Sequence, residues 1–150
     1  MYVFTQKISS ELEPTLTLPL TAEERTRSRY RYRMANGMAD EEIYLELPRG
    51  TTLRDGDCLG DDGHAQVLKI VAKPEPVLTV RAAMDVEPAL PLLRAAYHLG
   101  NRHVALEVGT DYLRLTPDSV LEAMLHQLGV TMVAETKPFQ PESGAYGHHH

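Results

Sequence analysis

The chain has little cysteine, few aromatic residues and no long apolar run, and each shortage excludes a class of protein. A single cysteine, Cys58, permits neither an internal disulfide nor a cysteine-based zinc site. With no tryptophan and only two phenylalanines, the core must be built mainly from smaller aliphatic residues and methionine. No run approaches the ~18 apolar residues of a membrane span, and the N-terminal residues lack the pattern of a signal peptide. We therefore expect a cytoplasmic protein without membrane contact.

The remaining composition is that of a globular protein. Hydrophobic residues make up 43% and charged residues 24% of 150 residues, which excludes disordered and collagen-like chains. This length suits one large domain or two small ones. The formal net charge is −6, yet one short stretch gathers five arginines.

That arginine-rich stretch, residues 25–34, alternates arginine with Thr, Ser, Tyr or Met. In a strand, a period of two places all five guanidinium groups on one face. They belong to Arg25, Arg27, Arg29, Arg31 and Arg33. A solvated outer face is one interpretation, and a docking face for an acidic partner or RNA is the other. Because Tyr30 and Tyr32 would point to the opposite face, the strand offers no mixed stacking platform for nucleic acid, and we expect no nucleic-acid partner.

The pattern divides the chain into two domains and a tail. Residues 1–73 contain short alternating strands, one of which is expected to stop at Pro19, with a loop expected at 55–63, and they predict an all-β domain. Prolines at 74 and 76 mark the boundary. Residues 74–137 predict a β-α-β-β-α-β order, hence a ferredoxin-like domain, and residues 138–150 predict a flexible tail. The fold class is α+β.

Two helices are expected in the second domain. The first, over residues 88–99, has the apolar stripe Leu92, Leu93, Ala96 and Leu99. The second begins with Thr116 as its N-cap and ends at Gly129. Its inward residues are Val120, Leu121, Met124, Leu125 and Leu128.

Seven histidines are the most suggestive polar residues. His98 ends the first helix, and His103 is expected to open the next strand on its non-core face. Spacing alone leaves two interpretations open: both are surface histidines, or His103 meets a partner chain closely. The terminal His148, His149 and His150 are either a remnant of a purification tag or a native tail suited to nickel, copper or zinc.

No enzymatic motif is present. The sequence lacks a phosphate-binding glycine loop, a nucleophile elbow and a His-Glu-x-x-His helix. Glu122 and His126 share a helix face but find no further ligand, and the acidic loop 55–66 lacks the spacing of a calcium loop. We expect a protein that is not an enzyme.

Three segments together are similar to a known family. They are Leu47-Pro48-Arg49-Gly50 with Asp55-Gly56-Asp57, then Ala95-Ala96-Tyr97-His98-Leu99-Gly100-Asn101-Arg102-His103, and finally Phe139-Gln140-Pro141-Glu142 with Gly144-Ala145-Tyr146-Gly147. They resemble the UreE family of urease accessory proteins over nearly the whole chain.

The resemblance implies a nickel metallochaperone that delivers Ni²⁺ for assembly of the urease metallocentre. It implies a homodimer in which His103 of each subunit binds the metal at the interface, with His98 auxiliary and the tail histidines as further ligands. The stretch 116–119 has no histidine, so an auxiliary site of some members is expected to be absent. Implied partners are the urease apoprotein and its accessory proteins, including the maturation GTPase. Cu²⁺ and Zn²⁺ should compete for imidazole ligands.

Overall fold

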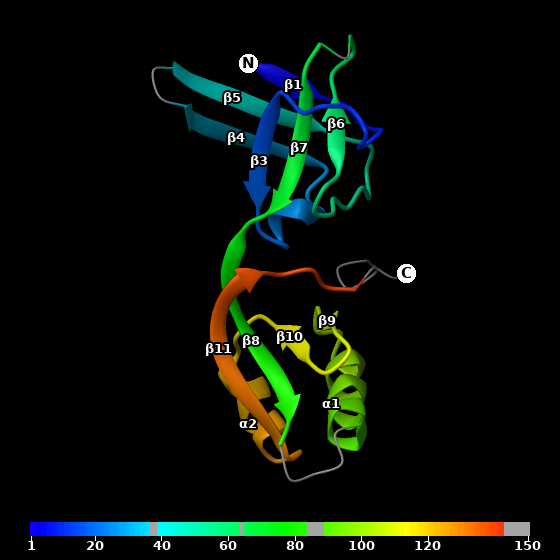
Figure 1. The fold of residues 1–150 in the computed structure, drawn as a ribbon, viewed down its shortest axis with the longest axis vertical. Coiled ribbons are helices and arrows are strands. Elements are labelled where there is room, and N and C mark those ends of the chain that lie inside the picture. Colours follow the sequence, from blue (N-terminus) through cyan, green and yellow to red (C-terminus); the bar gives the residue numbers. More distant parts are fainter. Residues whose placement is uncertain (37–38, 64, 84–88, 143–150) are drawn as a thin grey trace. The chain divides into compact units, whose positions relative to one another are not determined.

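A computed structural model describes residues 1–36, 39–63, 65–83 and 89–142. The chain forms two compact units, Met1–Lys73 and Pro74–His150 (Figure 1). None of the helices in the described ranges has both the length and the apolar character that crossing a membrane requires.

The first unit is built from two small sheets. One has the order β1-β5-β4 and the other the order β2-β6-β7-β3. The strands are β1 (Tyr2–Phe4), β2 (Gln6–Ile8), β3 (Leu16–Leu20), β4 (Arg29–Asn36), β5 (Ala39–Glu46), β6 (Cys58–Gly60) and β7 (Val67–Ala72). β1 runs parallel to β5 and β3 parallel to β7, while the other pairs are antiparallel.

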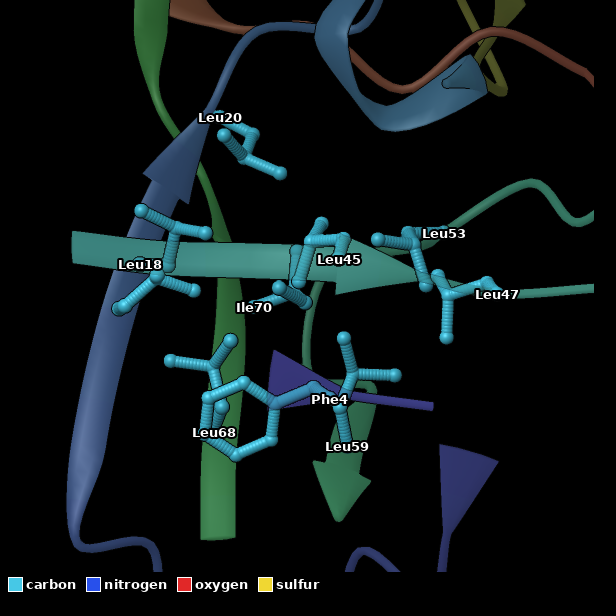
Figure 2. Close-up of a cluster of buried hydrophobic side chains, with 10 residues drawn as sticks. Phe4, Leu18, Leu20, Leu45, Leu47, Leu53, Leu59, Leu68 and Ile70 are labelled. Carbon is cyan, nitrogen blue, oxygen red and sulfur yellow. The ribbon is translucent and has the colours of Figure 1, made fainter. Parts of the chain in front are cut away.

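The core of this unit lies between the two sheets. Figure 2 shows β5 crossing β3 and β7, with leucines from each strand meeting around Phe4. Along β3, and at Ile43 and Leu45 of β5, alternate residues are buried because successive side chains point to opposite faces. The fully buried side chains are Phe4, Leu18, Leu20, Ile43, Leu45, Leu59, Leu68 and Ile70. Tyr30 and Tyr32 also pack against this cluster, so the tyrosines of the arginine-rich stretch do face inward.

Two expectations about strands in this unit are wrong. The loop expected at 55–63 contains β6, which pairs with β2 and β7. The strand expected to stop at Pro19 continues to Leu20. Among the described strands β3 pairs with β7 alone, and an edge strand tolerates a proline that cannot donate a hydrogen bond.

The arginine-rich stretch is not one strand, and this corrects the prediction for Arg25 and Arg27. Residues Glu24–Thr26 form a 3₁₀ helix, η1, and β4 begins only at Arg29. Arg25 is 3% exposed, and its Nε donates to the carbonyl of Thr21 at 3.3 Å. Arg25 therefore has a structural position, and the five guanidinium groups do not share a face.

Glu24 holds η1 in place. Its Oε1 accepts the amide of Thr21 at 2.9 Å, and its own amide donates to the Thr21 hydroxyl at 3.2 Å, which is the reciprocal pattern of a capping box. The Tyr30 hydroxyl donates to Oε2 at 2.5 Å. Burial alone would raise the pKa of Glu24, but these hydrogen bonds and Lys73 outweigh it and hold the pKa below its usual 4.5. The same hydrogen bond to Glu24 raises the pKa of Tyr30 to about 12.

The second unit has the predicted β-α-β-β-α-β order and confirms the α+β fold class. Its elements are β8 (Pro74–Ala82), α1 (Ala89–Asn101), β9 (Glu107–Val108), β10 (Leu113–Leu115), α2 (Ser119–His126) and β11 (Val130–Pro138). The sheet order β11-β8-β10-β9 is antiparallel throughout and places the first and third strands at the centre, as in ferredoxin-like domains (Figure 1). The prolines at 74 and 76 lie within β8, where only β11 pairs with them.

The apolar face of this sheet packs against both helices. Leu78, Val80, Leu113 and Leu115 from the strands meet Ala95, Leu99 and Leu125 from the helices. Gly129 follows α2 with a φ of +77°, which is the left-handed conformation. The sequence predicted a helix end at this glycine, and helices commonly end on a residue in this conformation.

Three details of the predicted helices are wrong. Leu93 of α1 and Val120 of α2, both expected inside, are 65% and 75% exposed. The N-cap of α2 is Asp118 rather than Thr116, because its carboxylate accepts the amides of Val120 and Leu121.

The segment after β11 is ordered as far as the structure describes it. The amide of Gln140 donates to Glu107 Oε1 at 2.8 Å, and the amide of Glu142 donates to the Leu106 carbonyl at 2.8 Å. Residues 138–142, expected to begin a flexible tail, are thus held beside β9. Residues 143–150 lie outside the described residues.

We predict that Glu24→Gln lowers the free energy of unfolding of the first unit by about 1.5–3 kcal/mol at pH 7, because it weakens hydrogen bonds to a carboxylate. Because the pKa of Glu24 is lower in the folded than in the unfolded state, its ionised carboxylate stabilises the unit above pH 4.5. This contribution is lost as the pH falls through the lowered pKa. Hydrogen exchange of the slowest amides of this unit should therefore show the difference between the two proteins shrinking below about pH 4.5. Glu23→Gln, which removes only an exposed ion pair with Arg27, should show little effect at any pH.

Candidate metal site

His103 lies at the turn that ends α1. Its amide donates to the carbonyl of Gly100 at 3.0 Å, and the amide of Val104 donates to the carbonyl of Leu99 at 3.1 Å. These two bonds form a Schellman motif with His103 at C′. Val104 also packs with the buried Leu99 in the core of the unit, which is the hydrophobic contact that usually accompanies this motif.

The backbone of His103 is left-handed. Its φ is +58°, and no other non-glycine residue in the described ranges has a positive φ. This conformation costs an L-residue roughly 1–2 kcal/mol and is usually taken by glycine. The backbone conformation therefore disfavours a histidine at this position. Residues held in such disfavoured conformations are concentrated at functional sites.

The predicted strand at His103 is wrong, but its exposure is as expected. Residues 103–106 are not a strand, since β9 covers only Glu107–Val108. The His103 side chain is exposed, and no hydrogen bond or ion pair joins its ring to any residue in the described part of the chain. The turn therefore directs a free imidazole into solvent, which leaves its nitrogen atoms open to a metal.

His98 has a different environment. It lies in the last turn of α1, half-buried, with its ring edge-on to Tyr97 at a centroid distance of 5.2 Å. Its carbonyl accepts a hydrogen bond from Arg102 Nη1 at 3.4 Å. His98 is thus packed against its helix, whereas His103 projects beyond it.

One chain does not assemble a complete metal site from its described residues. Among them, no three His, Cys, Asp or Glu side chains are close enough to hold an ion together. His148, His149 and His150 lie outside the described residues, as does His64. Cys58 is a free, buried thiol in the first unit. A metal on His103 with three or more such protein ligands would therefore need at least one from outside the described ranges or from another chain.

An exposed apolar stripe on α1 leads towards His103, and sequence reasoning missed it. Leu90, Leu93 and Tyr97 are 49%, 65% and 68% exposed, and their spacing of three and four residues places them on one helix face. Gly100 continues this face, and a Cβ atom there would meet nothing within 4 Å. The sequence does contain a signal for this stripe, because the helix has apolar residues on more than one face. Packing against a single core requires an apolar stripe on one face only.

The arginines of β4 lie on an exposed face that carries its own counter-groups. In register, Arg29 lies opposite Glu46, Arg31 opposite Tyr44 and Arg33 opposite Glu42. Arg33 approaches Glu42 at 3.5 Å, and the Arg31 guanidinium lies 5.7 Å from the Tyr44 ring centroid. Arg27 pairs with Glu23 at 2.9 Å. The cross-strand carboxylates reduce the attraction of this face for an acidic partner.

We predict that His103→Gly is more stable to unfolding than His103→Ala by about 1 kcal/mol, because only glycine adopts a positive φ without steric cost. Arg102 is the matched control, since its φ is not positive. There the order should reverse, with Arg102→Gly less stable than Arg102→Ala. Hydrogen exchange of the slowest α1 amides measures both differences, and equal signs at the two positions would contradict the backbone argument.

Comparisons with known proteins identify the family of the chain. The family model "UreE urease accessory protein, N-terminal domain" matches residues 5–73, and the model "UreE urease accessory protein, C-terminal domain" matches residues 75–150. A Nostoc sp. protein named urease accessory protein UreE is 52% identical over 152 residues, covering 100% of this chain and 99% of its own. A Thermosynechococcus vestitus protein of the same name is 50% identical over 151 residues, covering 99% and 100%. The resemblance seen in the sequence is confirmed, and the chain belongs to the UreE family of urease accessory proteins.

Proposed function

We propose that this protein carries Ni²⁺ to urease during maturation and that His103 is its principal ligand. The observation behind the proposal is the exposed, unpaired imidazole held in a left-handed turn in a chain of this family. Neutral imidazole suits Ni²⁺ and also Cu²⁺ and Zn²⁺, so selectivity must come from metal supply or from the receiving complex. The protein acts as a carrier and not as an enzyme.

The metal is proposed to lie between two copies of the chain. Because a two-fold interface presents the same surface twice, one His103 from each protomer supplies two imidazoles to one ion. This accounts for the lack of a three-ligand group among the described residues of one chain. His148, His149 and His150 are proposed as additional, exchangeable ligands, and His98 as an auxiliary group.

The exposed stripe on α1 supports the dimer. Leu90, Leu93 and Tyr97 form a row of large apolar side chains in solvent, and Gly100 allows a close approach at the end nearest His103. A two-fold axis at that end brings the two His103 residues together. Burying the stripe also removes its apolar surface from water.

The proposed partners are the urease apoprotein and its accessory proteins, including the maturation GTPase, in the cytoplasm. A β-domain module that docks an acidic partner through Arg25–Arg33 is the weaker alternative, because Arg25 is buried and Arg33 already meets Glu42. If β4 takes part in recognition, Arg29 and Arg31 are the residues we propose for it.

We predict that His103→Ala weakens the tightest Ni²⁺ site by more than about 100-fold, since loss of an outer-shell partner alone costs 10–100-fold. His98→Ala is the control and should change the affinity far less. Isothermal titration of untagged protein, with circular dichroism to confirm folding, measures both, and wild type should bind one tight ion per dimer. A folded His103→Ala protein with unchanged affinity would refute the ligand assignment.

We predict that Leu93→Glu weakens the dimer by about 30-fold or more, the loss expected for a central interface residue worth ~2 kcal/mol. Val120→Glu is the control, because Val120 is even more exposed but lies on α2. Sedimentation equilibrium of both variants should show dissociation only for Leu93→Glu. Dimers of equal strength would place the interface elsewhere.

A further inference from the structure

The surface around the end of α1 carries positive charge and lacks carboxylates. Residues 89–106 include Arg94, Arg102 and two histidines but no aspartate or glutamate, in a chain whose formal net charge is −6. Both arginines are exposed. Among the residues that the structure describes, neither forms an ion pair with a carboxylate. This surface therefore holds guanidinium charge that no described ion pair neutralises.

The two arginines lie on one side of the helix. A spacing of four residues places Arg94, His98 and Arg102 in one row along α1 and its last turn. The His98 ring meets the Tyr97 ring edge-on at 5.2 Å, so the row borders the exposed apolar stripe to which Tyr97 belongs. In the proposed dimer, burial of the stripe leaves the row at the polar rim of the interface, and the two-fold axis presents it twice.

Arg102 is held at the end of the helix nearest to His103. Its Nη1 donates to the carbonyl of His98 at 3.4 Å. The carbonyl end of a helix dipole is negative and would by itself attract a cation, but the guanidinium places a positive charge there. Arg102 directly precedes His103, and neighbouring Cα atoms are about 3.8 Å apart. A metal on His103 thus lies close to a fixed positive charge.

The carboxylates that follow this segment leave the row unneutralised. Glu107 is already paired with Arg114 Nη1 at 3.1 Å. Glu142 meets the segment at its far end, where its amide donates to the carbonyl of Leu106 at 2.8 Å. The unpaired positive charge is therefore carried by α1 and its last turn.

We propose that Arg94 and Arg102 form a docking surface for carboxylate groups of the protein that receives the metal from His103. This inference rests on the proposed function, in which the ion leaves this protein for another. Guanidinium groups bind carboxylates with a matching planar geometry, often through two parallel hydrogen bonds. An acidic acceptor also brings groups that ligate metals, since carboxylates serve as ligands beside imidazoles.

The same charges act on the ion in the opposite direction. A guanidinium group near His103 repels Ni²⁺, whereas it attracts the carboxylates of an acceptor. Both effects depend on ionic strength, because the Debye length is about 30 Å at 0.01 M and about 3 Å at 1 M. Arg94 and Arg102 therefore favour transfer to an acidic acceptor over retention of the ion, and salt should remove this preference.

The docking surface is tested first without metal. At an ionic strength of about 0.01 M, a hexaglutamate peptide should shift the NMR amide signals of residues 94–104 in isotope-labelled, full-length protein. We expect the Arg94→Gln, Arg102→Gln double variant to reduce these shifts about three- to tenfold, since each exposed ion pair contributes 0.2–1 kcal/mol. Because both positions are exposed and glutamine favours helices, the remaining signals should show an unchanged fold.

Arg81→Gln is the matched control, because it removes the same charge from the same unit. Arg81 is exposed and follows Val80, which packs in the core with the helices. Successive strand residues point to opposite faces, so Arg81 belongs to the face of the sheet that does not meet α1. Its guanidinium lies 5.7 Å from the ring centroid of Tyr112. Undiminished shifts in the double variant, or an equal loss in Arg81→Gln, would overturn the proposal.

Transfer of the ion then relates the surface to the proposed function. Nickel-loaded protein is mixed with nitrilotriacetate, which carries carboxylates, or with terpyridine, which is uncharged, and each rate of transfer is measured. The ratio of the two rates cancels any change in how tightly the protein holds the ion. We expect the double variant to lower this ratio about three- to tenfold at about 0.01 M ionic strength and less than about twofold at 1 M. Arg81→Gln should leave the ratio unchanged.

The outcomes separate this inference from the proposed function. If hexaglutamate shifts the expected signals but the wild type binds no Ni²⁺, the proposed function fails while a carboxylate-binding surface stands. If the wild type binds Ni²⁺ but the double variant keeps the wild-type ratio at low ionic strength, this inference fails and the His103 site remains.

Discussion

The second unit depends on a single backbone constraint, the left-handed conformation of residue 103. It satisfies the last carbonyls of α1, returns the chain to the core through Val104, and leads to β9. Glycine is the residue that this geometry favours. A histidine there gives up local stability for a side chain that points away from the helix and has no partner in the described part of the protein. The same turn thus closes the fold and exposes the imidazole.

The two faces of the sheet behind this turn have different roles, one apolar and one polar. Residues such as Leu78, Val80 and Leu115 bury apolar surface against the helices. This burial stabilises the unit, but the hydrophobic effect is not directional. The opposite face uses Arg114 and Glu107 in a nearly buried ion pair at 3.1 Å. Such a pair contributes little net stability but demands one geometry.

The sequence predicted the α+β class, the order of elements in the second unit and the family, because each rests on periodicity or on contiguous motifs. It failed where a decision depended on tertiary contacts. The alternation of arginines suggested a strand from residue 25, although Thr21 and Glu24 at capping-box spacing already indicated a helical turn. Asp118 and Thr116 are both good N-caps, and only the structure distinguishes them. His103 was predicted to be a ligand through the family resemblance and stays a prediction, while its left-handed turn has no sequence signal, since glycine would be the expected residue. The polar contacts on the opposite sheet face were not predicted because their members are far apart in sequence, as in the Thr79–Glu135 pair, separated by 56 residues.

The metal carrier proposed above has to bind its cargo and also release it, and an exposed imidazole on a fixed turn is compatible with both. A closed cage of rigid side chains in one chain would hold the ion without an exit. A single imidazole on a fixed turn contributes only part of a coordination shell, so the remaining ligands can be exchanged one at a time by a receiving protein. Under this proposal, release requires only that the exchangeable ligands leave the metal before the imidazole of His103 does.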